Sequence, residues 1–150
     1  MIKTTISHEP EGFHFWMLSE GGIPAIADRQ FQEFRAQRFL LLGRAIAVSV
    51  VSEFTEIPIT VEFDRFGPDP ITESSWDRIV ECPLAVGSKA IVFESAVGDE
   101  FGRLEVPSGL YRLRICYGGQ NTRQHSGESA DFYLIQIWPS KDTSTKIIKP

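Results

Sequence analysis

The amino-acid sequence predicts a mainly β protein, a single-domain antiparallel β-sandwich of jelly-roll-like type. Short runs in which apolar and polar residues alternate recur along the chain, and runs rich in glycine, proline and acidic residues separate them. We count about eight such runs and one convincing helical segment, near residues 28–41. This succession of elements favours two packed sheets over alternating βαβ units.

Length and composition indicate a single globular domain and argue against a general nucleic-acid-binding protein. The chain has 150 residues, of which 42% are hydrophobic and 23% charged, as is ordinary for one globular domain. A formal net charge of −5 lacks the basic excess of a general nucleic-acid binder. The same charge fits either simple solubility or a basic protein partner. We expect one domain over residues 1–140 and a loose tail over residues 141–150.

Targeting and membrane signals are absent from the sequence. The first residues, M-I-K-T-T-I-S-H, lack the apolar run of a signal peptide, and no apolar run approaches the length of a membrane span. Cys82 and Cys116 have neither metal-ligand spacing nor the density of a disulfide scaffold. We therefore expect a cytoplasmic protein that does not act on a membrane and needs no metal or other cofactor.

The first two strands are predicted over residues 2–9 and 13–18, with a turn at residues 10–12. The second strand is dense in aromatic residues. A metal site built on His8 and His14 is an alternative interpretation, but the sequence offers no third ligand cluster for it.

Residues 28–41 favour a helix. Asp28 is a suitable N-cap, the residues after it have good helix propensity, and Gly43 suits the position just past a helix end. An alternative is that residues 39–42 already belong to a strand.

Four further strands are predicted over residues 45–51, 57–63, 76–86 and 90–95. The alternation of apolar and polar residues is clearest in residues 57–63. Pro83 lacks the N–H that a sheet ladder uses, which indicates an edge position or a bulge.

The stretch from residue 103 to residue 139 carries the clearest sandwich signal. Gly109 belongs to a tight turn between two strands. Tyr111 follows that turn, as in a tyrosine corner, where the hydroxyl bonds the backbone a few residues upstream; a plain core tyrosine is the alternative. Residues 131–138 are apolar on both faces, which suits a central strand covered on both sides.

A catalytic constellation cannot be assembled from the sequence. It contains no G-x-S-x-G elbow, no phosphate-binding loop, no H-E-x-x-H and no paired C-x-x-C. The best enzymatic alternative is Cys116, which alternates onto the same strand face as Arg112 and Arg114, where positive charge would lower the pKa of its thiol. Since no histidine is placed beside it, we predict no catalytic residue and no enzymatic activity.

Acidic side chains recur from residue 62 to residue 81, interleaved with two aromatic residues. Carboxylates around an aromatic anchor suit a basic protein partner that has a pocket. A charged outer edge that prevents sheets from pairing is the alternative. The candidate partner-binding residues are Glu62, Asp64, Phe66, Asp69, Glu73, Trp76 and Asp77, and Glu81 continues the acidic run.

The loop over residues 118–129 is a second candidate surface. It is long for a hairpin connection, which fits either a functional loop or an ordinary flexible insertion. Its candidate residues are Gln120, Asn121, Arg123 and His125. A solvated loop histidine is the alternative for His125.

The order of the segments resembles that of the competence protein J family, from about residue 6 to residue 138. The matching segments include A-I-A-V-S-V-V, I-P-I-T-V-E-F, I-V-E-C-P-L-A-V, the corner L-E-V-P-S-G-L-Y-R-L and the closing A-D-F-Y-L-I-Q-I-W. The resemblance implies a non-enzymatic protein that binds and blocks a nuclease or toxin-like enzyme, as an inhibitor or a bacterial immunity protein. It assigns no functional residue to this chain. The alternatives are a small-ligand-binding β-sandwich or an enzyme that uses the 118–129 loop.

Overall fold

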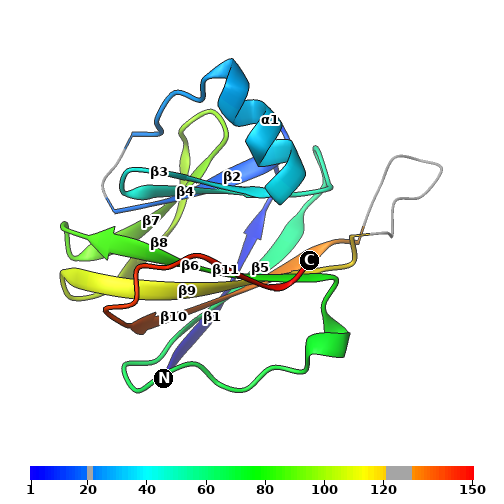
Figure 1. Cartoon of the computed structure of the whole chain (residues 1–150). Coiled ribbons are helices and arrows are strands. Elements are labelled where there is room, and N and C mark those ends of the chain that lie inside the picture. Colours follow the sequence, from blue (N-terminus) through cyan, green and yellow to red (C-terminus); the bar gives the residue numbers. More distant parts are fainter. Residues whose placement is uncertain (20–21, 121–129) are drawn as a thin grey trace.

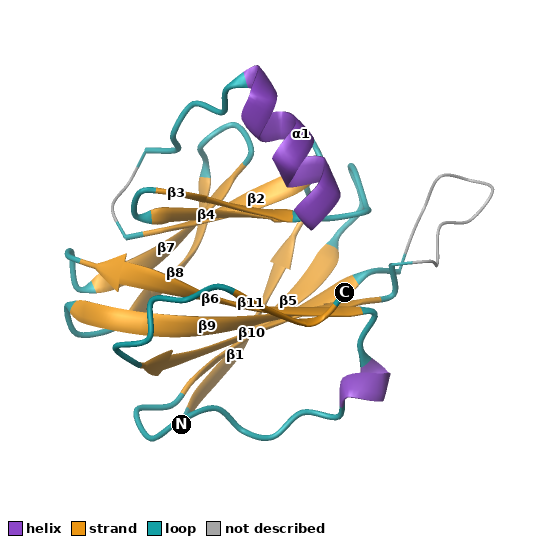
Figure 2. Cartoon of the chain, in the orientation of Figure 1, coloured by secondary structure: helices purple, strands orange, loops and turns teal. Residues whose placement is uncertain are grey.

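The computed structural model describes residues 1–19, 22–120 and 130–150, which form two packed β-sheets and one α-helix (Figure 1). The mainly β sandwich predicted from the sequence is confirmed, as the two layers of strands in Figure 2 make plain. The described residues form six strands in one sheet and five in the other, rather than about eight in all. None of the helices among the described residues is long and apolar enough to cross a membrane.

The larger sheet has six strands. In spatial order they are β1 (Ile2–His8), β5 (Ile57–Phe63), β10 (Phe132–Pro139), β9 (Gly109–Gly118), β6 (Arg78–Val86) and β11 (Lys146–Lys149). Neighbouring strands are antiparallel except β5 and β10, which run parallel. Strand β6 therefore runs in the same direction as β5. A long connection must join them, because β5 ends at the opposite end of the sheet from the start of β6.

The smaller sheet is antiparallel throughout. Its strands are, in spatial order, β3 (Phe39–Leu42), β4 (Ala45–Ser49), β2 (His14–Leu18), β7 (Ala90–Ser95) and β8 (Glu100–Glu105). The core lies between the two sheets, where every second side chain of each strand points inward. It contains Phe15, Met17, Ile46 and Phe93 from the smaller sheet and Val61, Leu113, Ile115 and Ile135 from the larger one.

Helix α1 (Asp28–Gln37) lies on the outer face of the smaller sheet (Figure 1). Its Phe34 joins Trp16 and Leu40 in a second buried cluster between helix and sheet. The helix is shorter than the predicted 28–41, because Arg38 adopts a left-handed conformation with φ 65° and its N–H bonds the carbonyl of Phe34 at 2.7 Å. Strand β3 follows at once, so the alternative interpretation of residues 39–42 is the correct one.

Two predictions about the larger sheet were wrong. Residues 131–138 are not covered on both sides, since Phe132 is 40% exposed and Leu134 and Trp138 are only half-buried. Residues 141–150 are not simply a tail, because β11 pairs with β6 as an edge strand. That pairing stops at Glu81, so Pro83 lies on a part of β6 that pairs with β9 alone, which fits the edge position predicted for it.

The sandwich has two ends, which differ in character. At one end the hydroxyl of Tyr111 donates to the carbonyl of Pro107 at 2.5 Å, which is the bond that the tyrosine-corner interpretation predicts. We call this the corner end; it also carries the turns at residues 64–67 and 87–89. The opposite end, where β2, β5 and β10 begin, carries the loops at residues 9–13 and 50–56, and we call it the loop end.

Replacing Tyr111 by phenylalanine removes this single hydroxyl. Because Tyr111 is 4% exposed and its bond to Pro107 is partly buried, we expect a loss of about 1 kcal/mol in the free energy of unfolding. Urea denaturation followed by circular dichroism measures the change. An unchanged midpoint for Tyr111→Phe would show that the corner does not depend on this bond.

Candidate functional site

A row of polar side chains crosses the outer face of the larger sheet from edge to edge. Each member lies directly opposite the next in the register of neighbouring strands. The row consists of Lys3, Glu62, Gln136, Arg114, Glu81 and Lys146. Side chains in this relation interact directly, so the alternating charges stabilise one register.

The middle of the row is a buried hydrogen-bonded network. Glu81 accepts from Nε of Arg112 at 2.9 Å and from Nε of Arg114 at 3.1 Å. Arg114 Nη1 donates to Oε1 of Gln136 at 3.1 Å, and Nε2 of Gln136 donates to Oε1 of Glu62 at 3.0 Å. Arg112 and Gln136 are 3% and 1% exposed, so the network is sheltered from water and holds the strands in place.

Glu62 and Glu81 therefore belong to the sheet's own framework. Glu62 is 9% exposed, and its second oxygen lies 3.6 Å from the ammonium of Lys3. Both carboxylates were predicted to be part of an acidic docking edge. With their charges already paired within the chain, they have little left to offer a partner.

The connection from residue 64 to residue 77 crosses the outer face of the larger sheet. In Figure 1 it is the green segment that runs below the lower sheet. Its two ends are tied to opposite ends of the sheet, where Asp64 N–H bonds the carbonyl of Ile137 (3.1 Å) and Asp77 N–H bonds that of Tyr117 (2.8 Å). Between them, the carbonyl of Asp69 accepts from Gln136 Nε2 at 3.0 Å. The buried network thus also fixes this connection.

The predicted acidic edge is consequently spread along the sheet and does not form one patch. Asp64 and Phe66 lie at the corner end, where the Asp64 carboxylate accepts the N–H of Phe66 at 2.9 Å. Phe66 is 91% exposed. Asp69 and Glu73 are exposed along the connection, and Glu73 leads into the loop end.

An aromatic groove lies at the loop end of this outer face. The ring of Trp76 packs 5.4 Å from that of Phe132, and a groove of about 360 Å³ extends from them to Pro58. Asp77 lies beside Trp76, and its carboxylate accepts the N–H of Gln120 at 2.9 Å. Of the predicted partner-binding residues, Glu62 and Trp76 line this groove, and Glu73 and Asp77 lie next to Trp76 along the chain.

The 118–129 loop begins at the same end. Asn121, Arg123 and His125 lie outside the described residues. Gln120 is engaged within the chain: its Nε2 donates to the hydroxyl of Tyr133 at 3.2 Å, and its Oε1 accepts from Nη1 of Arg38 at 3.5 Å.

A buried carboxylate, missed in the sequence analysis, ties the loop at residues 50–56 to the sheet. Asp131 is 1% exposed and accepts from the N–H groups of Val51 at 3.0 Å and Ser52 at 3.3 Å. It also accepts from the hydroxyls of Ser52 and Tyr133, the latter at 2.5 Å. Burial, and next the charge of Asp131, raise the pKa of Tyr133, so this tyrosine stays protonated and keeps donating.

The thiol hypothesis for Cys116 was wrong. Burial raises the pKa of Cys116 to about 12, and the neighbouring Arg114 opposes this only in part. Burial also raises the pKa of Cys82 to about 12. Both thiols therefore stay protonated at neutral pH and are poor nucleophiles.

The histidines of the first two strands are packed as aromatic rings. His8 stacks on Phe101 with ring centroids 3.8 Å apart, and His14 meets Trp16 and Phe34 edge-on. Burial lowers the pKa of both histidines, which favours neutral rings. Among the described residues no three His, Cys, Asp or Glu side chains gather in a way that could hold a metal ion.

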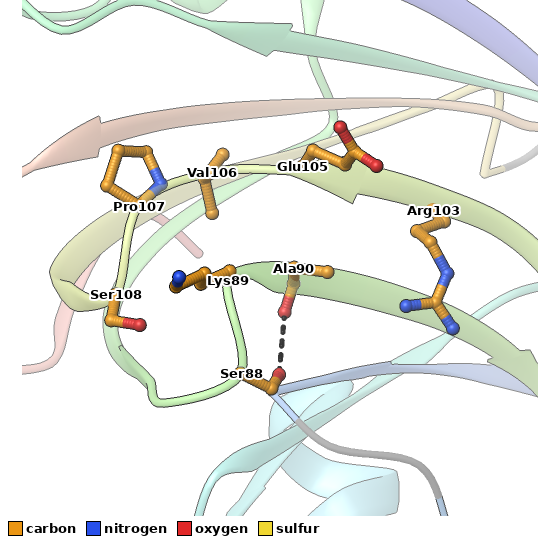
Figure 3. Close-up of a pocket in the computed structure, with 8 residues that line it drawn as sticks. All are labelled: Ser88, Lys89, Ala90, Arg103, Glu105, Val106, Pro107 and Ser108. Carbon is orange, nitrogen blue, oxygen red and sulfur yellow. Dashed lines mark hydrogen bonds between the residues drawn. The ribbon is translucent and has the colours of Figure 1, made fainter.

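A shallow pocket of about 730 Å³ lies at the corner end, between the turn before β7 and the turn after β8 (Figure 3). Lys89 and Arg103 are its cations, and Figure 3 shows them on opposite sides with their charged groups pointing apart. Arg103 is moreover paired with Glu100 at 2.7 Å. The pocket therefore presents no convergent pair of charges for an anionic ligand.

Two solved structures share the fold over nearly the whole chain. The crystal structure of ComJ from Bacillus subtilis, an inhibitor of the DNA-degrading activity of NucA, matches with a TM-score of 0.69 and 17% identity, covering 93% of this chain and 96% of that one. The protein of crocagin biosynthetic gene J matches with a TM-score of 0.55 and 10% identity, covering 94% of this chain and 100% of that one. The resemblance inferred from the sequence is thus confirmed at the level of the fold.

Sequence comparison adds nothing further, because no family model and no curated protein matches the chain.

The buried network generates a prediction about stability. Glu81→Ala leaves two sheltered guanidinium groups without their carboxylate, and we expect a loss of about 3 kcal/mol in the free energy of unfolding. Glu100→Ala is the matched control, because its pair with Arg103 is about half exposed and should matter far less. Equal shifts of the urea midpoint in the two variants would contradict the structural role of the network.

Proposed function

We propose that this chain is a binding protein that inhibits a nuclease or a related toxin-like enzyme by occluding its substrate groove. The observation that carries the proposal is the match to ComJ, which extends over almost the full length of both chains. The state of the candidate catalytic residues also supports a binding role. Cys116 and Cys82 are buried thiols with raised pKa values, and the rings of His8 and His14 pack against aromatic neighbours.

The partner's chemistry follows from its substrate. An enzyme that cleaves DNA binds a polyanionic backbone, so its groove is basic. The net charge of −5 on this chain is complementary to such a surface. An inhibitor that protects the cell in which it is made would act in the cytoplasm.

The docking surface that we propose lies at the loop end. Glu73 and Asp77 are exposed there beside Trp76, whose groove with Phe132 can take an apolar side chain of the partner. Asp69 adds an exposed carboxylate along the same connection. Asp64 and Phe66 are left out of this surface because they lie at the corner end.

The proposal is tested by titrating the chain into DNA-cleavage assays with NucA and a panel of other basic, non-specific nucleases. We expect complete inhibition of at least one enzyme at about one molecule of inhibitor per enzyme. Asp69→Lys and Glu73→Lys should slow association roughly tenfold without lowering Tm, because reversed rim charges weaken long-range attraction. Added salt should have the same effect on the unaltered chain.

Glu105→Lys is the control, since it makes the same change in net charge at an exposed position of the corner end. Absence of inhibition across the panel would refute the proposed function. Equal slowing by Glu105→Lys would refute only the placement of the docking surface.

A further inference from the structure

Two neighbouring loops at the loop end present phenylalanine side chains to solvent. Phe13 is 43% exposed and Phe54 is 65% exposed. The loops are bonded to each other, because the N–H of Phe54 donates to the carbonyl of Pro10 at 2.8 Å and the N–H of Val50 donates to that of Phe13 at 2.9 Å. The two loops that carry these residues are therefore held together at one end of the sandwich.

The backbone at both residues has a conformation that bulky side chains rarely adopt. Phe13 has φ 62° and Phe54 has φ 58°, in the left-handed region that glycine and asparagine tolerate far better. Such residues persist only where the surrounding structure holds them. Here the carboxylate of Glu53 accepts the N–H of Gly12 at 3.0 Å, and Asp131 holds the other loop through the N–H groups of Val51 and Ser52.

Neither phenylalanine belongs to the hydrophobic core between the two sheets. An exposed ring adds little to the core, and the left-handed backbone favours smaller residues at both positions. Two such residues on neighbouring, hydrogen-bonded loops indicate a use outside the chain itself.

The surface around the two rings extends in both directions. Next to Phe13, a groove of about 220 Å³ continues onto α1 and is lined by Phe31, itself 38% exposed, and by Arg35. On the other side, Asp131 joins the loop of Phe54 to the start of β10. The next residue of β10, Phe132, begins the aromatic groove described above.

Exposed carboxylates lie near both phenylalanines in the sequence. Glu9 and Glu11 flank the loop of Phe13, and Glu56 flanks that of Phe54; all three are exposed. An aromatic anchor enclosed by charges that complement the partner is the arrangement of an interface hot spot. The occupant that this surface fits is accordingly a basic protein with an apolar pocket.

We propose that Phe13 and Phe54 are the apolar anchor with which this chain binds a basic nuclease, and that Glu9, Glu11 and Glu56 form the rim that steers the enzyme onto them. This inference rests on the proposed function and names the residues that supply most of the affinity.

The test uses Phe54→Asn in the full chain, against the nuclease of the panel that the unaltered chain inhibits most strongly. Asparagine tolerates the left-handed backbone, so Tm should stay unchanged or rise while the ring is lost. We expect Kd to weaken at least about 30-fold, as for a hot-spot residue. Phe13→Asn should act in the same direction.

Two variants serve as matched controls. Phe66→Asn removes an exposed phenylalanine at the corner end, and Lys89→Asn replaces an exposed residue of that end whose φ is 62°. Both should leave Kd within about twofold. This pair separates loss of the anchor from loss of any exposed ring and from relief of any left-handed residue.

Each outcome decides between the two proposals. Unchanged inhibition by Phe54→Asn and Phe13→Asn, with a nuclease that the unaltered chain inhibits, overturns the anchor and leaves the proposed function standing. Absence of inhibition by the unaltered chain overturns both. Concentration-dependent self-association that Phe54→Asn abolishes, measured by analytical ultracentrifugation, assigns the surface to a second copy of the chain and overturns the anchor as well.

Discussion

The buried charge network on the outer face of the larger sheet is the interaction on which the rest of the structure depends. Arg112 and Arg114 are sheltered cations, and each needs the carboxylate of Glu81 to offset its lost hydration. A slip of one residue between strands would break every pair in the row. The same network holds the Asp69 carbonyl through Gln136, and it holds the C-terminal segment because Arg112 Nη1 donates to the carbonyl of Ser144 at 2.6 Å.

This constraint separates the scaffold from the surface that is free to bind. The polar residues of the larger sheet's outer face are largely paired with one another, and α1 covers the outer face of the smaller sheet. Both ends of the sandwich stay open, and the loop end is the one where neighbouring loops carry two exposed rings, Phe13 and Phe54, together with exposed carboxylates. Binding residues on loops held by a rigid framework are a common arrangement in β-sandwich proteins. The inhibitor that we propose would dock with this one end of the sandwich.

The features that sequence reasoning found are those encoded locally. Alternation located β5 at its observed bounds, and the turn before Tyr111 indicated the corner bond. Features that depend on pairing across the sheet could not be found in this way, such as the burial of Glu62 or the edge strand β11. The left-handed backbone of Phe54 leaves no trace in residue type, because bulky residues such as phenylalanine are rarely found in that conformation.

Hydrogen–deuterium exchange on the complex with an inhibited nuclease tests the central claim, that the loop end is the binding surface, most directly. The account predicts that amides in residues 10–14, 52–56 and 76–78 exchange at least about tenfold more slowly in the complex than in the free chain. Amides in the corner-end turns, at residues 87–89 and 106–110, should exchange at the same rate in both. Slowed exchange at the corner end, with none at the loop end, would contradict the account.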